Sequence, residues 1–241
     1  MHRRARHLNA RDAGATMVLD ARFISGSDGD AIGTWSSRTS STYDMTQSTA
    51  SYKPLLKLGA NGINGQATVL FDGTNDRMDG ANENVSSLTI FAVARQSGAN
   101  TFRVISGRSN TSNYAREYQL GAYNYPPYPD YIEMSNRDAS NGAGAYNNDF
   151  TTGFHLCCGT LNSSQTTISV DGKAATTGTV LTGQADRPWN LGYLNDGPSG
   201  PSSFFDDKIS AVFLFKNQVA TSSVIKRINH SLGFSFKIAC S

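Results

Sequence analysis

Acid–base catalysis needs carboxyl groups that this sequence supplies sparingly. The chain has only three glutamates, Glu83, Glu117 and Glu133, and no E-x-D-x-x-E run. A glycoside hydrolase needs two carboxyl groups that converge on one bond, and along a strand such groups share a face only at even spacing. Aspartates from distant segments could still meet in space, but nothing local arranges them. We therefore predict that the chain is not an enzyme.

Nucleophilic catalysis has equally little support. Outside the first sixteen residues the histidines are His155 and His230, and there is no G-x-S-x-G motif. Cys157 and Cys158 are adjacent and would point to opposite faces of a strand, whereas Cys240 is the penultimate residue. This spacing makes neither a disulfide framework nor a zinc site. We expect structural histidines and buried thiols, although a bridge to Cys240 stays open.

Oxygen-rich side chains gather in one short segment that contains Asp72, Asp76 and Asp79. Calcium takes about six to eight oxygen ligands from carboxylates, amides and carbonyls, so these three aspartates are candidate metal ligands. The alternative interpretation is a turn at Asp72-Gly73 in which the carboxylates cap backbone N–H groups. The spacing is not that of an EF-hand loop. Calcium is the one cofactor that the sequence suggests.

Tyrosine and proline dominate the segment 123–131, and a second polar loop, rich in glycine, occupies residues 195–201. Tyrosine rings offer flat apolar faces to a sugar, and proline keeps the segment extended, which limits the entropy lost on binding. Tyrosines also favour protein–protein contacts, and a rigid connection between strands is a third interpretation. The candidate ligand-binding residues are Tyr123, Tyr125, Tyr128, Tyr131, Asn195 and Asp196.

Positive charge is concentrated at the start of the chain. Residues 1–16 hold Arg3, Arg4, Arg6 and Arg11 against a single aspartate, and the rest of the chain has 17 basic and 18 acidic residues. Such an arm is attracted to acidic surfaces or nucleic acid. We expect it to contact neighbouring subunits of an assembly rather than nucleic acid, and the alternative is an arm without a role.

We expect strands to position these side chains. Charged residues make up only 17% of the chain, against about 25% in an average globular protein, and a surface so poor in charge suits strands and turns better than long surface helices. Apolar residues alternate along 88–95 and along 209–215, and the second run is apolar on both faces, as in a central strand. Residues 154–161 and 166–170 flank the polar turn Asn162-Ser163-Ser164, which predicts a hairpin. The pattern is typical of an all-β sandwich.

One helix is predicted near the end of the chain. Thr221 or Ser222 caps it, the stripe of Val224, Ile225, Ile228 and Leu232 gives it an apolar face, and Gly233 ends it. A short strand over 234–238 should follow, and it could pair with an early strand over 17–23. No linker or repeat interrupts the pattern, so we predict one domain over residues 17–241 behind a basic arm, residues 1–16.

Six motifs occur in the order found in one family. They are FDGTND at 71–76, SLTIFAVAR at 87–95, VISGRS at 104–109, YQLGAY at 118–123, ISVDGK at 168–173 and FFDDKISAVFLFKNQVATSSVIKRI at 204–228. On these motifs, residues 17–238 resemble the concanavalin A-like, laminin G-like jelly rolls of bacterial and viral surface proteins. Phe154-His155, Asp207-Lys208 and Ala211 depart from the family pattern. The resemblance implies an antiparallel jelly-roll sandwich of two sheets with one short C-terminal helix.

The expected function combines the resemblance with the residues above. No apolar run follows the arm, so we expect neither a signal peptide nor a membrane-spanning helix. We predict a lectin-like binding or decoration module of a surface assembly, such as a virion decoration or fibre protein, in an extracellular or virion-surface location. Its rim loops would bind a glycan or a surface protein. The alternatives are a purely structural subunit and a polysaccharide-cleaving glycoside hydrolase.

Overall fold

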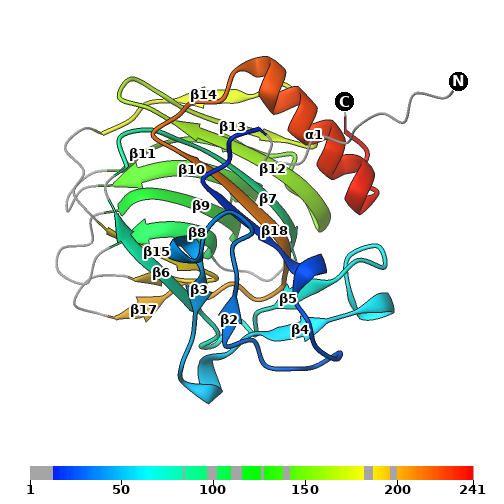
Figure 1. Cartoon of the computed structure of the whole chain (residues 1–241). Helices are drawn as coiled ribbons and strands as arrows, with labels where there is room; N and C mark the ends of the chain where they lie inside the picture. Colours follow the sequence, from blue (N-terminus) through cyan, green and yellow to red (C-terminus); the bar gives the residue numbers. More distant parts are fainter. Residues whose placement is uncertain are drawn as a thin grey trace, which may run out of the picture.

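Two layers of antiparallel strands make up the body of the protein in the computed structural model (Figure 1). The structure describes residues 13–83, 85–96, 102–109, 116–125, 128–137, 142–181, 187–195 and 200–240. Each layer is an eight-stranded sheet, and a separate two-stranded sheet lies beside the second layer. The predicted all-β sandwich is confirmed.

The first sheet is built around strands that are apolar on both faces, as the alternation of residues 88–95 and 209–215 predicts. Every pairing in it is antiparallel. Its strands, in spatial order, are β14 (Thr176–Gly178), β13 (Thr166–Val170), β12 (Gly153–Leu161), β7 (Leu88–Gln96), β18 (Lys208–Lys216), β5 (Thr68–Leu70) and β4 (Leu55–Lys57), with β1 (Met17–Asp20) also paired to β18.

The second sheet is also antiparallel. Its strands, in spatial order, are β11 (Gly142–Asn147), β10 (Tyr128–Arg137), β9 (Arg116–Tyr125), β8 (Phe102–Ser109), β15 (Arg187–Leu191), β6 (Met78–Glu83), β3 (Met45–Thr46) and β2 (Thr34–Trp35). The two-stranded sheet pairs β16 (Leu194–Asn195) with β17 (Pro201–Ser202). Short 3-10 turns occur at Ala21–Phe23, Ser41–Tyr43, Ala50–Tyr52 and Gly59–Asn61.

The main core fills the space between the two sheets. It takes Leu88, Ile90 and Ala92 from β7 together with Trp189 of β15 and Trp35 of β2, all buried. Ala94 of β7 also faces this core, whereas Phe91 and Val93 point outward. Alternating side chains thus hide one half of each strand inside the sandwich, which is the main source of its stability.

A bulge in β18 changes which of its residues face the main core. The alternation along 209–215 predicts Ile209 on the same face as Ala211 and Phe213. In the structure the register with β7 shifts between Ile209 and Ala211, so Ile209 joins Val212 in the main core while Phe213 faces outward. One extra residue in a strand reverses the alternation beyond it, and no feature of the sequence marks that position.

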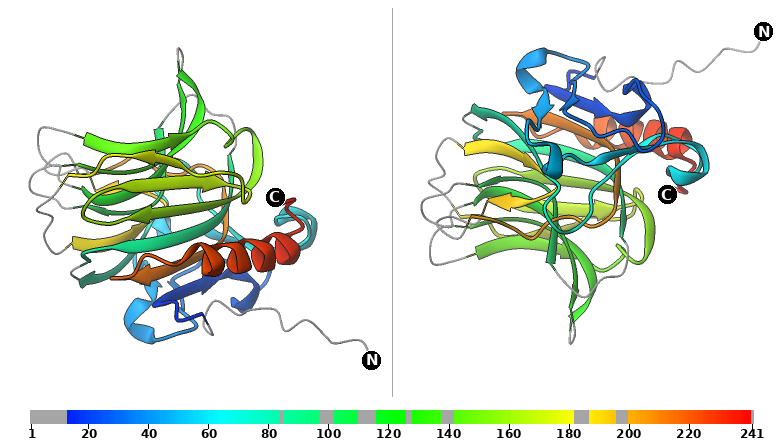
Figure 2. Two further views of the ribbon diagram at one scale, coloured as in Figure 1. Left: turned by 90° about the horizontal axis from the view of Figure 1, so that it is seen from above. Right: turned by 90° about the horizontal axis from the view of Figure 1, so that it is seen from below.

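The helix α1 (Ser222–Phe236) covers the outer face of the first sheet, and Figure 2 shows it along one flank of the molecule. Thr221 caps it by accepting a hydrogen bond from the N–H of Val224 at 3.4 Å. Its apolar stripe, Ile228, Leu232 and Phe236, packs with the outward residues of the first sheet into a second core. The predicted helix and its cap are therefore confirmed.

The end of the helix differs from the prediction. The helix continues through Gly233 to Phe236, and Lys237 closes it in a left-handed conformation. Gly233 is needed for space, because a Cβ there would lie 2.6 Å from Sγ of Cys240 and 2.9 Å from the carbonyl oxygen of Ile238. The segment that follows the helix returns and packs against Gly233, which is why a position within the helix requires glycine. In the sequence, a glycine near the end of a helical pattern looks like a stop signal.

The predicted strand over 234–238 and its pairing with an early strand are consequently wrong. The strand β1 pairs instead with β18, with Met17 opposite Leu214. The second core nevertheless brings the two described ends together, because Ala13 and Cys240 both pack against it. Both ends of the described chain therefore lie on the flank that α1 covers (Figure 1).

The two sheets meet along one edge, where β14 of the first lies against β11 of the second. The hydroxyl of Thr176 donates a hydrogen bond to the carbonyl oxygen of Tyr146 at 2.6 Å. A Cβ on Gly178 would overlap the carbonyl of Gly144, so only glycine permits this approach of two backbones. We call this edge, formed by Gly144, Tyr146, Thr176 and Gly178, the seam.

Two local predictions are confirmed, those of the hairpin and of the buried cysteines on opposite faces of a strand. The strands β12 and β13 form the predicted hairpin, and Oδ1 of Asn162 accepts hydrogen bonds from the N–H groups of Ser164 and Gln165 in its turn. Cys157 faces the main core and Cys158 the second core, and both thiols are buried and free. No helix in the described part of the chain is long and apolar enough to span a membrane.

Candidate functional site

The second sheet turns an unusually polar face away from the main core. Because its strands pair in register, one residue from each of the eight strands falls on a single line across this outer face. We call this line the polar row. Its members, in strand order from β2 to β11, are Thr34, Thr46, Asp79, Asn190, Gly107, Gln119, Ser135 and Gly144.

All eight members of the polar row are glycine or polar residues, whereas strands are ordinarily enriched in β-branched and aromatic residues. The middle of the row is covered, since Asn190 and Gln119 are buried, whereas its ends are accessible at Thr34 and Thr46 and, in part, at Ser135. Polar side chains on rigid strands, open at two ends, are suited to ligand recognition because they need little reordering on binding.

Three tyrosines lie beside the Ser135 end of the polar row, and we call them the tyrosine cluster: Tyr123, Tyr131 and Tyr146. Tyr123 and Tyr131 are partners on β9 and β10, with ring centroids 4.6 Å apart in a stacked arrangement. Tyr146 of β11 meets Tyr131 edge to face at 5.5 Å. Half of Tyr146 is exposed to solvent (50%), so the cluster presents one accessible ring on a fixed base.

A buried carboxylate adjoins the cluster. Glu133 is the direct partner of Tyr146 across β10 and β11. Its Oε1 accepts hydrogen bonds from the amide of Gln119 and from the hydroxyl of Ser135, the latter at 2.8 Å. Burial raises the pKa of Tyr146, and the negative charge of Glu133 raises it further. Tyr146 therefore stays protonated and can act as a hydrogen-bond donor at its hydroxyl.

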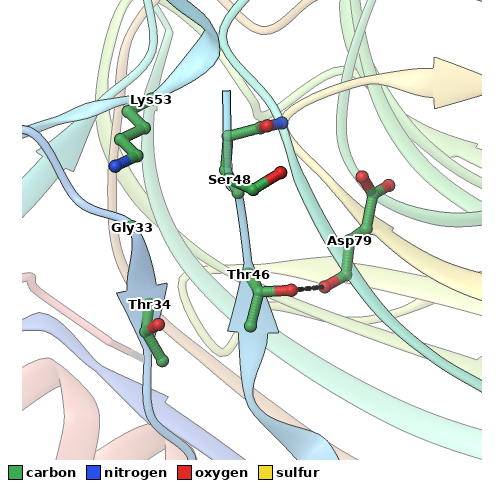
Figure 3. Close-up of a pocket in the computed structure, with 7 residues that line it drawn as sticks. Gly33, Thr34, Thr46, Ser48, Lys53 and Asp79 are labelled. Atoms are coloured by element: carbon green, nitrogen blue, oxygen red, sulfur yellow. Dashed lines mark hydrogen bonds between the residues drawn. The ribbon is translucent and has the colours of Figure 1, made fainter. Parts of the chain in front are cut away.

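A pocket lies at the other end of the polar row, where β2 and β3 meet β6 (Figure 3). Its volume is about 450 Å³, and its lining residues are Gly33, Thr34, Thr46, Gln47, Ser48, Lys53 and Asp79. Figure 3 shows Lys53 and Asp79 on opposite sides of the chain segment that carries Thr46 and Ser48. The pocket thus combines an ammonium group, a carboxylate and several hydroxyl groups.

Asp79 is fixed in this pocket by a tyrosine. The hydroxyl of Tyr193 donates a hydrogen bond to Oδ1 of Asp79 and accepts one from the amide of Asn190 at 2.9 Å. Burial, followed by the charge of Asp79, raises the pKa of Tyr193 well above its usual value. Tyr193 therefore keeps its proton and holds the carboxylate in place.

The tyrosines that the sequence singled out are only partly brought together. Tyr123 and Tyr131 meet in the tyrosine cluster. The backbones of Tyr125 and Tyr128 pair across β9 and β10, and their side chains lie outside the described part. Asn195 lies in β16, in the separate two-stranded sheet beside β8.

Two groups of predicted residues fall outside the described residues altogether. They are Asp196 of the polar loop and the four arginines of the arm, Arg3, Arg4, Arg6 and Arg11. The predictions for them stand as made.

The aspartates named as metal ligands serve the protein's own backbone. Oδ1 of Asp72 accepts hydrogen bonds from the N–H groups of Thr74, Asn75 and Asp76 at 2.8–3.1 Å. Burial works to raise the pKa of Asp72, but these bonds outweigh it and leave that pKa lowered. Burial and the charge of Asp72 raise the pKa of Asp76 to about 6. These contacts match the turn-and-cap alternative.

The three aspartates do not form one ligand set in the structure, because Asp79 belongs to β6 and bonds Tyr193. In the part of the chain that the structure describes, no three His, Cys, Asp or Glu side chains are grouped so that they could hold a metal. Arginines engage two further carboxylates, with Asp207 bonded to Arg95 at 2.7 Å and Asp206 to Arg103 at 3.3 Å. Calcium binding stays a prediction of the sequence.

His155 has a described partner at each ring nitrogen. Its Nδ1 lies 2.8 Å from Asp171 and its Nε2 3.0 Å from the carbonyl oxygen of Thr151. Asp171 also accepts a hydrogen bond from the N–H of Leu156 at 2.9 Å. The histidine thus ties the turn after β13 to the start of β12.

Sequence reasoning missed Tyr146, Lys53 and the role of Glu133. Tyr146 lies in a stretch of glycine and alanine, GAGAYN, that gives no clear strand alternation. Lys53 follows a 3-10 turn rather than a strand. Glu133 could have been placed opposite Gly121 and Tyr146 only if the order and register of β9, β10 and β11 were known. The signal was present only as a polar residue between Ile132 and Met134.

No known protein-family profile and no curated protein sequence matches the chain. Solved structures do match it. A SAP-like pentraxin from Limulus polyphemus is 12% identical with a TM-score of 0.51, over 65% of this chain and 79% of that one. A Trypanosoma rangeli sialidase is 14% identical with a TM-score of 0.51, over 91% of this chain and 33% of that one. The fold is a jelly-roll sandwich.

A carbohydrate-binding module of the CBM40 type, from the Ruminococcus gnavus IT-sialidase and solved with α2,3-sialyllactose, has a TM-score of 0.49. It is 12% identical, over 60% of this chain and 83% of that one. At such identities the likeness concerns the fold, and this chain spans only a third of the length of the T. rangeli sialidase. Function has to be argued from the side chains of the site.

Proposed function

We propose that the protein is a non-enzymatic, lectin-like module that binds a glycan on the outer face of its second sheet, at the tyrosine cluster. The observation that carries this proposal is the half-exposed ring of Tyr146, held edge to face on Tyr131 and next to the polar group of Glu133, Gln119 and Ser135. A sugar needs both a flat apolar surface and nearby hydrogen-bonding groups, and these lie within two strands of each other.

The arrangement supports binding through its rigidity. Tyr123 and Tyr131 are locked by stacking, and the seam holds the backbone of Tyr146 through Thr176. A ring fixed in this way loses little conformational freedom when a ligand covers it. This surface is part of a sheet, whereas the sequence placed the ligand at the rim loops. The flanking contacts that we propose, from their place in the sequence, are Tyr125, Tyr128, Asn195 and Asp196.

The spacing of the carboxylates supports binding rather than hydrolysis. The described part of the outer face includes the carboxylates of Asp79 and Glu133, and four strand spacings separate β6 from β10. At roughly 4.8 Å per spacing this is about 19 Å. The catalytic pair of a glycoside hydrolase is about 5–9.5 Å apart. Glu133 is also engaged by Gln119 and Ser135.

The wider role that we propose follows the family resemblance of the sequence. The chain would be a concanavalin A-like, laminin G-like module displayed on an extracellular or virion surface, with residues 1–16 as the contact to neighbouring subunits. The support for this role is the resemblance of the six motifs, the sandwich fold and the four arginines of the arm. A purely structural subunit is the outcome to which a failed glycan-binding test would point.

Replacement of Tyr146 by alanine tests the proposal. A glycan array first identifies an oligosaccharide that the full chain binds, and isothermal titration calorimetry then compares variants on that oligosaccharide. We expect Tyr146→Ala to weaken binding at least tenfold, because it removes the exposed ring. Phe23→Ala is the matched control, since Phe23 is comparably exposed (57%) but belongs to a 3-10 turn next to β1 of the first sheet. It should bind as the parent does.

An array without binding would contradict the proposed function, and unchanged affinity in Tyr146→Ala would contradict its location. Release of reducing ends from the bound oligosaccharide and from polymers such as laminarin or agar tests the non-enzymatic part. We expect no release. Release that is lost in Glu133→Gln would make the protein a hydrolase.

A further inference from the structure

We propose that the pocket at the β2–β3 end of the polar row binds a carboxylated sugar through Lys53. This inference rests on the proposed function, because it assigns an acidic residue to the glycan. The pocket has a volume of about 450 Å³, within the range of small-molecule sites. It faces the same side of the second sheet as the tyrosine cluster, since Thr34, Thr46 and Asp79 belong to the polar row.

Lys53 is the group in this pocket that calls for an anion. The arginines and lysines Arg22, Arg95, Arg103, Lys173 and Lys216 each form an ion pair with a carboxylate of the chain. The ammonium group of Lys53 forms no hydrogen bond or ion pair within the described residues, although the side chain is only partly exposed. An ammonium group that lines a pocket without a counter-ion attracts a ligand anion.

Gly33 makes room for that ammonium group. A Cβ at residue 33 would lie 3.3 Å from Nζ and 3.4 Å from Cε of Lys53. The lysine side chain therefore lies against the bare backbone of Gly33, on the side of the pocket opposite Asp79 (Figure 3). Packing of its stem against the wall restricts the rotamers of Lys53, which lowers the entropy lost on binding an anion.

The rest of the pocket matches the hydroxyl groups of a sugar. Oδ1 of Asp79 is taken by Tyr193, and its other carboxylate oxygen can accept a hydrogen bond from a ligand hydroxyl. Thr34 and Ser48 add hydroxyls that can both donate and accept. One cation and one anion on opposite walls suit a ligand with a single negative charge at one end and hydroxyls at the other. A doubly charged phosphate would meet the repulsion of Asp79.

Matched pairs of small probes test this inference on the full chain. Methyl β-D-glucuronide is compared with methyl β-D-glucoside, and methyl α-N-acetylneuraminide with its methyl ester, by chemical-shift titration in NMR. We expect each acid to bind at least fivefold more tightly than its neutral partner. Sodium chloride raised from 50 to 500 mM should reduce this preference, because the pocket is open to screening ions.

Variants of Lys53 test whether this residue causes the preference for the acid over the neutral probe. Lys53→Ala should abolish the discrimination between acid and neutral probe, whereas Lys53→Arg should keep part of it. Lys173→Ala is the matched control, because it removes an exposed lysine that pairs with Asp149, and it should leave the preference intact. Circular dichroism confirms that each variant is folded.

Two outcomes would overturn the inference: equal binding of acid and neutral probes by the parent chain, or a preference that survives Lys53→Ala. These outcomes differ from a failure of the proposed function. Oligosaccharide binding that depends on Tyr146 but not on Lys53 leaves the tyrosine cluster as a glycan site and removes the acidic pocket. If acid binding depends on Lys53 and Tyr146→Ala has no effect on binding, the acidic pocket is kept and the tyrosine cluster is rejected as a glycan site.

Discussion

Individual side chains on the outer face are held by neighbours that set their charge and direction. Tyr193 fixes Asp79, and Gln119 with Ser135 fixes Glu133. Asp76 is different, because it is nearly buried (6% exposed) and is repelled by the charge of a second carboxylate, Asp72. The one described hydrogen bond of its carboxylate comes from the N–H of Asp72 at 3.1 Å. The ionised form of Asp76 therefore destabilises the fold.

Replacement of Asp76 by asparagine should stabilise the protein at neutral pH. The pKa of Asp76 is about 6 in the folded chain against an ordinary value of 3.8. A raised carboxyl pKa means that the folded state binds the proton more tightly, so the contribution of Asp76 to stability is greatest below pH 4 and is lost as the pH rises to 6. At pH 7 we expect Asp76→Asn to raise the free energy of unfolding by about 1–2 kcal/mol.

Urea unfolding between pH 4 and 8 measures this effect, and the gap between the variant and the parent should close toward pH 4. Asp72→Asn is the control with the opposite sign, because it weakens the acceptor for three N–H groups. A gap that stays constant with pH would contradict the assigned pKa.

Secondary-structure elements were predictable where the hydrophobic pattern was long and clean. The alternation in β7 and the apolar run of β18 identified central strands, and the turn at Asn162 identified a hairpin. The prediction failed where tertiary contacts override a local signal. Gly233 is a helix terminator in isolation, but here it lies within α1 because Cys240 and Ile238 return against it. The bulge before Ala211 is equally invisible in a single sequence.

Substitution of Gly233 separates local helix propensity from tertiary contact as influences on the stability of α1. Alanine favours an isolated helix over glycine by about 1 kcal/mol, but its Cβ would press on Cys240 and Ile238. We expect Gly233→Ala to lower the free energy of unfolding by about 1–2 kcal/mol, measured by chemical denaturation. Lys226→Ala, on the exposed face of α1, should change it by less than about 0.5 kcal/mol.

A double variant checks the cause. Cys240→Ala in the background of Gly233→Ala should recover part of the loss, because it removes Sγ, the atom nearest to the new Cβ. A more stable Gly233→Ala protein would show that propensity outweighs the contact.

The whole molecule depends on the order in which strands lie side by side, and this order was largely hidden in the sequence. Periodicity gave the sandwich class, but it could not place β15 between β8 and β6 or β2 and β3 at the far edge. The polar row is a product of that order, since its members come from eight separate strands. The candidate site was therefore predictable only for Tyr123 and Tyr131, which are close in sequence.

The seam gives a test at this scale. Gly178→Val would push β14 away from the carbonyl of Gly144, and we expect a loss of more than about 3 kcal/mol in the free energy of unfolding, or a chain that does not fold. Thr176→Val is the milder variant, because it removes only the hydroxyl that donates to the carbonyl oxygens of Tyr146 and Ile168, and should cost about 1 kcal/mol.

Thermal and urea unfolding with near-ultraviolet circular dichroism compare these variants. Since Thr176 holds the strand of Tyr146, Thr176→Val should also weaken oligosaccharide binding. A Gly178→Val protein as stable as the parent would show that the two sheets are not joined at this edge.

Ala13 and Cys240 both pack on the flank under α1, and the polar row lies on the other side of the sandwich. A tether attached beyond either of these residues therefore leaves from the back of the molecule, while the polar row looks outward. Copies fixed to a common support in this way would all present the same surface to a glycan coat. Their individually weak contacts would then add up to high avidity.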